Sequence, residues 1–176
     1  MKFERTELPG VARVVPEPIA DARGFFARLF CPEEFADAGC PFAPVQMSLS
    51  RNLAAHTLRG LHFQSPPFAE AKIVRVVRGS VYDVVVDLRP ESPAYRRWTA
   101  ANLSADNGEA LLIPEGCAHG FLTLEDATDV LYQIDRLYTS GHARGVRYDD
   151  PALNVAWPAS PRVIAPADLA WPPLEG

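Results

Sequence analysis

The sequence predicts an all-β domain of the sandwich or barrel type. Short apolar runs rich in β-branched and aromatic residues recur along the chain, as expected for strands of about four to eight residues. Turn-forming segments such as 104–108 and 114–116 separate these runs. Only one segment, which begins at Pro32, carries convincing helix-start signals. Many short strands with few helices favour an antiparallel sandwich or barrel.

The expected elements follow in chain order. Strands are predicted at 11–15, 25–30, 45–50, 58–64, 73–77, 81–88, 97–103, 110–113, 120–124 and 130–135. The segment 21–24 forms a turn, and a helix of about two turns begins at Pro32 and ends at Gly39. Gly79 and Ser80 are expected to join 73–77 and 81–88 as a β-hairpin. The proline-rich C-terminal segment should wrap the body, with a helical turn at 166–169.

Composition limits the class of protein. The sequence has 176 residues, of which 48% are hydrophobic and 22% are charged, and residues 1–176 are expected to form one globular domain. The net charge of −5 argues against nucleic acid or an anionic membrane as the main partner. The chain has neither an apolar run of ~20 residues nor a secretory signal, so we expect a cytoplasmic protein. Cys31, Cys40 and Cys117 are spaced unlike a zinc module and are expected to be reduced structural thiols.

The stretch from Leu58 to Val77 carries the strongest chemical signal. Strict alternation puts Gly60, His62 and Gln64 on one face of an extended segment, and Arg59 and Leu61 on the other. Lys72 opens the next apolar run after a turn. A base and a cation are therefore expected near each other.

Four ordered motifs together identify a family resemblance. They are the segments 59–64, 74–79, 113–121 and 148–151. These segments resemble the dTDP-4-dehydrorhamnose 3,5-epimerases, and the similarity extends from about Asp21 to Asp168. The resemblance implies an isomerase with an all-β, cupin-type double-sheet jelly roll and short peripheral helices. It also implies a homodimer that exchanges N-terminal strands, a nucleotide-sugar substrate, dTDP-linked in this family, and no cofactor.

Epimerisation beside a ketone needs a base, a positive group at the enolate oxygen and an acid on the opposite ring face. The resemblance assigns His62 as the base and Asp168 as the carboxylate that orients it. It assigns Tyr132 as the acid, because a phenol is protonated at neutral pH. Lys72 corresponds to the lysine beside the keto oxygen.

The resemblance also supplies substrate contacts. His119 is expected to hydrogen-bond the sugar or its phosphates. Arg59 and Arg23 are expected to bind the pyrophosphate, with Arg23 reaching the site of the partner subunit. Binding of the nucleotide is assigned to three further residues, which are Gln46, Ser48 and Tyr138.

A metal site is not expected. Metal-binding cupins usually carry two histidines one residue apart together with a carboxylate, whereas Gln64 stands at that spacing from His62. Three ligands are therefore difficult to assemble in this segment.

Some positions depart from the family pattern. Arg28 and Ala143 stand where glutamates are usual, Ala167 replaces a lysine, and Ser48 replaces an asparagine. Since the base, acid and cation are retained, the sugar and the nucleotide are less well defined than the reaction. Two alternatives remain open: a keto-isomerase that moves the carbonyl, and a sugar-nucleotide binding module without catalysis.

Overall fold

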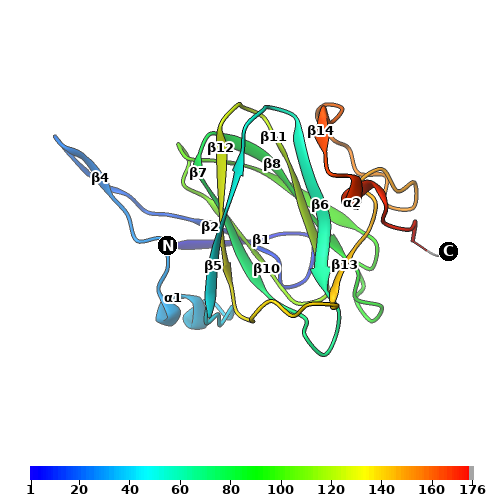
Figure 1. The fold of residues 1–176 in the computed structure, drawn as a ribbon. Helices are drawn as coiled ribbons and strands as arrows, with labels where there is room; N and C mark the ends of the chain where they lie inside the picture. Colours follow the sequence, from blue (N-terminus) through cyan, green and yellow to red (C-terminus); the bar gives the residue numbers. More distant parts are fainter. Residues whose placement is uncertain (175–176) are drawn as a thin grey trace.

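The chain folds into two facing β-sheets with two short helices outside them, as a computed structural model of residues 1–174 shows (Figure 1). This confirms the predicted double-sheet jelly roll. The strands are β1 (Lys2–Arg5), β2 (Ala12–Val15), β3 (Ile19–Asp21), β4 (Gly24–Phe26), β5 (Gln46–Asn52), β6 (Thr57–Gln64), β7 (Lys72–Arg78), β8 (Ser80–Asp87), β9 (Trp98–Ser104), β10 (Ala110–Ile113), β11 (Cys117–Thr123), β12 (Thr128–Ile134), β13 (Ala143–Gly145) and β14 (Val163–Ile164). The helices are α1 (Pro32–Asp37) and α2 (Pro166–Leu169).

From β5 to β8 and again from β9 to β13, the chain passes to the other sheet at each successive strand. One sheet has the order β1-β2-β10-β7-β12-β5, and the other has the order β13-β6-β11-β8-β9 with β14 added beside β6. The predicted hairpin of 73–77 with 81–88 is therefore wrong, because β7 and β8 belong to opposite sheets. Gly79 has φ 74°, and a Cβ there would lie 2.4 Å from Thr128 Oγ1. The same turn chemistry serves a corner between sheets as well as a hairpin.

The inward face of each sheet carries both hydrophobic core residues and polar residues. Val74 and Val76 on β7 and Val130 on β12 pack against Val81 and Val85 on β8. Lys72, Tyr132, His119 and Asp83 occupy the same inward rows, two residues from these or from equivalent core positions. The space between the sheets is thus a hydrophobic core that gives way to a polar region. Cys117 belongs to this core, and burial raises the pKa of its thiol to about 12.

The outer faces of the sheets are covered by different parts of the chain. Phe35 of α1 and Phe42 pack on the outer face of the first sheet. Leu153 and Trp157 of the C-terminal segment cover the outer face of the second sheet beside Leu61, as expected for a segment that wraps the body (Figure 1). Among residues 1–174, no helix is long and apolar enough to cross a membrane.

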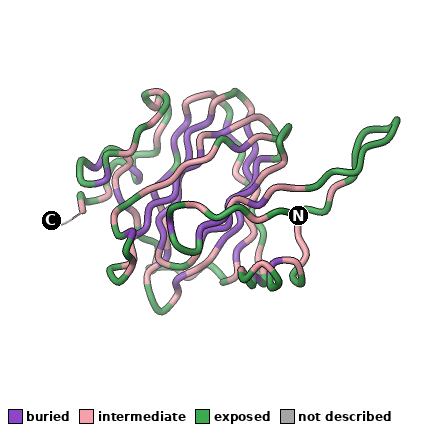
Figure 2. Tube along the Cα trace, turned by 180° about the vertical axis from the view of Figure 1, so that it is seen from behind, coloured by how far each residue is buried: buried purple, intermediate pink, exposed green. Residues whose placement is uncertain are grey.

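The β3–β4 hairpin forms an arm that projects from the body. Its six strand residues are all exposed, and Figure 2 shows the arm exposed along its length. The turn predicted at 21–24 connects these two strands, and the strand predicted at 25–30 ends at Phe26. Ile19, Phe25 and Phe26 are 75%, 69% and 76% exposed. An exposed hairpin that carries several large apolar side chains is typical of an element that packs on a second chain.

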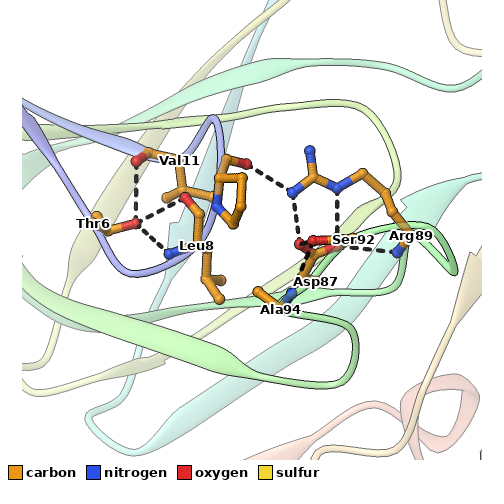
Figure 3. A network of polar contacts seen from close by, with 8 residues as sticks. Thr6, Leu8, Val11, Asp87, Arg89, Ser92 and Ala94 are labelled. Atoms are coloured by element: carbon orange, nitrogen blue, oxygen red, sulfur yellow. Dashed lines mark hydrogen bonds and ion pairs between the residues drawn. The ribbon is translucent and has the colours of Figure 1, made fainter.

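A buried carboxylate at the end of β8 anchors the N-terminal segment (Figure 3). Asp87 accepts hydrogen bonds from Arg89 Nη2 at 2.6 Å and from Ser92 Oγ at 2.6 Å. Arg89 Nη2 also donates to the carbonyl of Pro9 at 2.7 Å. Burial alone would raise the pKa of Asp87, but the hydrogen bonds of Arg89 and Ser92 lower it overall.

Asp87→Asn should lower the free energy of unfolding at pH 7 by about 1–3 kcal/mol, because the partly buried donors Arg89 and Ser92 lose a charged acceptor. The folded-state pKa of Asp87 is lowered, so its contribution is present above its unfolded-state pKa of ~3.9 and is lost as the pH falls through the folded value. The difference from wild type should therefore shrink as the pH is lowered towards about 3. Urea unfolding followed by circular dichroism measures it. Asp37→Asn, at an exposed position, is the control, and a difference that does not vary with pH would contradict this role.

Candidate active site

A cavity of about 300 Å³ lies between the two sheets, beside the hydrophobic core. Both sheets contribute to its walls, together with the loop before β7. The lining residues are Ser50, Arg59, His62, Glu70, Lys72, His119, Tyr132 and Ile134. Five of the ten residues assigned from the resemblance (Arg59, His62, Lys72, His119 and Tyr132) thus meet in one cavity.

A bulge in β6 brings Arg59 and His62 to the same side. His62 pairs with His119 and Arg59 pairs with Phe121, so two residues of β6 face the single residue Gly120. The predicted alternation, which put Arg59 and His62 on opposite faces, is therefore wrong. A Cβ on Gly60 would lie 2.6 Å from the Cα of Gly120, so the bulge requires glycine at this close approach.

Asp168 fills a gap in the pairing along the side of β6 that faces β13 and β14. β14 pairs with Thr57 and Leu58, and β13 pairs with residues 62–64. Between them, the amide of Gly60 donates to Asp168 Oδ2 at 3.2 Å, and Asp168 Oδ1 lies 2.8 Å from His62 Nε2. The carboxylate is thus fixed by the backbone and in turn fixes the imidazole. With the Nε2 proton donated to Asp168, His62 Nδ1 keeps its lone pair for accepting a proton.

Tyr132 lies on β12, in the sheet opposite His62. Burial raises the pKa of its phenol, the charge of Asp83 raises it further, and Arg59 opposes both effects. The phenol therefore stays protonated at neutral pH and can donate a proton. Because the two sheets form opposite walls of the cavity, a ring between them would have the imidazole on one face and the phenol on the other.

His119 is paired with a carboxylate that the sequence reasoning missed. Its Nε2 lies 3.0 and 2.9 Å from the two carboxylate oxygens of Asp83, and both side chains are buried. Burial raises the pKa of Asp83, whereas His119 and Lys72 lower it. The available signal was a carboxylate within the apolar run Val81–Val86, since a buried charge needs a partner.

Lys72 is held by a second overlooked acid. Its Nζ donates to Glu70 Oε1 at 2.8 Å, and the side chains are 7% and 10% exposed. Arg59 lies at the exposed side of the cavity, where its Nε donates to Asn52 Oδ1 at 2.8 Å. The cavity therefore has two oriented cations, one inside and one at its mouth.

Two of the three residues assigned to the nucleotide, Gln46 and Ser48, lie on β5, the strand that carries the cavity residue Ser50. Gln46, Ser48 and Ser50 share one face of this strand by their spacing, and Ser48 lies opposite Tyr132. Gln46 Oε1 accepts from the backbone amide of Tyr138 at 3.3 Å. Ser50, which the assignment omitted, lines the cavity, and its buried Oγ has no hydrogen-bond partner within the described chain.

Arg23 does not reach this cavity within one chain. It lies in the turn between β3 and β4, 90% exposed, where it pairs with Asp21. Arg28 pairs with Glu34 of α1, and Ala143 lies opposite Gln64 on β13, so neither departure from the family pattern lines the cavity. Among residues 1–174, no group of three potential metal ligands is found.

Comparison with known proteins places the chain in a family. Residues 5–176 match the family model described as dTDP-4-dehydrorhamnose 3,5-epimerase. A relative of that description from Sinorhizobium fredii is 38% identical over 99% of this chain and 90% of its own length. The Bacillus anthracis structure of that description, with TDP and PPi bound, has a TM-score of 0.95 and 38% identity, covering 98% of this chain and 99% of its own. A 4-keto-6-deoxy sugar epimerase from Streptomyces spheroides has a TM-score of 0.92 and 35% identity, covering 97% and 86%. This chain belongs to the dTDP-4-dehydrorhamnose 3,5-epimerase family.

Proposed function

We propose that this protein epimerises a dTDP-linked 4-keto-6-deoxyhexose at C3, C5 or both, through an enolate. The observation that carries the proposal is that His62 and Tyr132 line one cavity from opposite sheets. A base on one face of a sugar ring and an acid on the other are what inversion of a carbon beside a ketone requires. Membership of an epimerase family supports the same reaction.

Proton removal is the role of His62. Its hydrogen bond to Asp168 fixes the ring so that Nδ1 is the free nitrogen. Once the imidazole has taken the proton from C3 or C5, the carboxylate of Asp168 stabilises the positive charge. The electron pair of the broken C–H bond forms a double bond to C4, and the π electrons of the C4 ketone move onto its oxygen to give the enolate.

Lys72 stabilises the enolate oxygen. Its ammonium lies in the largely water-excluded part of the cavity, where a charge stabilises a developing oxyanion more strongly than it would in water. Tyr132 then donates its proton to the opposite face of the carbon, which inverts the centre. His119, held by Asp83, and Ser50 are suited to bind sugar hydroxyl groups.

The pyrophosphate and the base are bound outside the cavity. Arg59 at the mouth is suited to a phosphate, and Tyr138, 64% exposed, can stack on a base. The bound TDP and PPi of the Bacillus anthracis relative support a thymidine nucleotide as the nucleotide part of the substrate. We propose that the arm crosses to a second copy, so that Arg23 of one subunit completes the phosphate site of the other.

His62→Asn should reduce solvent exchange of the C3 and C5 protons at least ~100-fold, because the base is lost. Exchange is measured in deuterium oxide by NMR with a dTDP-4-keto-6-deoxyglucose substrate. His56→Asn is the matched control, because His56 lies outside the cavity and its φ of 59° suits asparagine. Equal exchange in His62→Asn and wild type would refute the base assignment. A carbonyl shifted to C3 in the wild-type product would instead identify a keto-isomerase.

Tyr132→Phe should retain solvent exchange while reducing inversion at least ~100-fold, because the base remains and the acid is removed. The configuration of recovered sugar is read from proton coupling constants. Tyr95→Phe is the control, since Tyr95 lies outside the cavity and is 40% exposed. Normal inversion in Tyr132→Phe would assign the acid to another group.

Arg23→Ala and His62→Asn subunits should complement each other in a mixed dimer. If Arg23 serves the other subunit, the Arg23→Ala subunit keeps its own His62 and receives Arg23 from its partner. Random co-assembly of equal amounts then restores about a quarter of the wild-type sites. Activity of co-expressed subunits at low substrate concentration measures this. Activity no higher than the sum of the separate variants would show that Arg23 does not act across subunits.

A further inference from the structure

Glu70 is the only acidic residue among those lining the cavity of the described chain. It lies in the loop between β6 and β7, and its side chain is only 10% exposed. The proposed reaction gives it no direct task. A carboxylate close to an enolate would raise the energy of that enolate by like-charge repulsion, unless a cation stood between them. The contacts of Glu70 show such a cation.

The two carboxylate oxygens of Glu70 have different partners. Oε1 accepts from Lys72 Nζ at 2.8 Å, and Oε2 accepts from Gln64 Nε2 at 2.7 Å. Gln64 Oε1 in turn accepts from the backbone amide of Thr139 at 3.0 Å. Since an amide N–H can only donate, Thr139 fixes which end of Gln64 faces Glu70. The carboxylate is therefore held at both oxygens.

This chain of hydrogen bonds removes the freedom of Lys72. A lysine side chain has four rotatable carbon–carbon bonds, and its ammonium has no preferred direction of its own. Lys72 is 7% exposed, so water can do little to hold it. A fixed acceptor at 2.8 Å leaves the remaining N–H donors to point into the cavity.

We infer that Glu70, itself held by Gln64, is a positioning residue that aims the ammonium of Lys72 at the ketone oxygen of the substrate. This inference rests on the proposed function. Glu70 touches no reacting atom and acts only through Lys72. The link to Thr139 also connects Lys72 with the loop that carries Tyr138, the residue proposed to stack on the base.

A double-mutant cycle between Glu70 and Lys72 tests the inference. Glu70→Gln keeps the shape and one oxygen acceptor but removes the charge. It should lower kcat for solvent exchange ~10- to 100-fold while KM changes less than ~3-fold, because an interaction of the transition state is lost. In a Lys72→Met background the same change should cost less than ~2-fold, because the two residues act as one unit.

Two further variants make the result specific. Glu70→Asp keeps the charge and should retain more activity than Glu70→Gln, whereas a merely structural role would favour the isosteric glutamine. Glu7→Gln is the matched control, because Glu7 is an exposed acid that pairs with Arg97 at 3.1 Å far from these contacts. Calorimetric binding of TDP and the thermal midpoint report whether each variant is folded.

The outcomes separate this inference from the proposed function. Two outcomes would overturn the positioning role and leave the epimerase proposal intact. One is solvent exchange at the wild-type rate in Glu70→Gln. The other is a double variant whose loss of rate equals the product of the losses in the two single variants. A wild-type protein that exchanges neither proton would overturn the proposed function itself. If Glu70→Gln does not fold, Glu70→Asp against Lys72→Met gives the same cycle.

Discussion

Every charged side chain between the two sheets needs a partner, and this requirement determines the layout of the cavity. Burying an unpaired charge costs several kcal/mol, which is a large part of the net stability of a folded domain. The carboxylates of these pairs are the buried groups: Asp168 is paired with His62, Asp83 with His119, and Glu70 with Lys72. Each pairing avoids the cost of an unpaired buried charge and also fixes the direction in which the nitrogen atoms of the pair point. The contacts that pair the buried carboxylates are therefore the same contacts that orient the groups proposed to act on the substrate.

Reactive side chains and hydrophobic core residues lie on the same inward faces of the strands. Val74 and Val76 follow Lys72 on β7, and Val130 precedes Tyr132 on β12, so each reactive group is flanked by packed side chains. Such neighbours leave few rotamers open and exclude water. The cavity is therefore rigid because it continues the hydrophobic core rather than interrupting it.

The sequence predicted the fold class and most strands, because alternation and turn residues are local signals. It did not predict that Gly79 turns the chain from one sheet to the other, because sheet membership depends on pairing between distant strands. The bulge at Gly60 was missed for the same reason, since it depends on the facing Gly120. The resemblance supplied five residues that line the cavity, whereas Glu70 and Asp83 became evident only through their contacts. Arg23 stays a prediction, because its proposed target lies on another chain.

The contact between Gly60 and Gly120 limits how this protein can be redesigned. Each glycine sits where a methyl group would meet the backbone of the opposite strand at 2.6 Å, so neither position accepts a side chain. Directed evolution towards other sugars would have to hold these two positions constant. Diversity is better introduced at Ser50 and Ile134, which line the cavity and carry no part of the strand crossing.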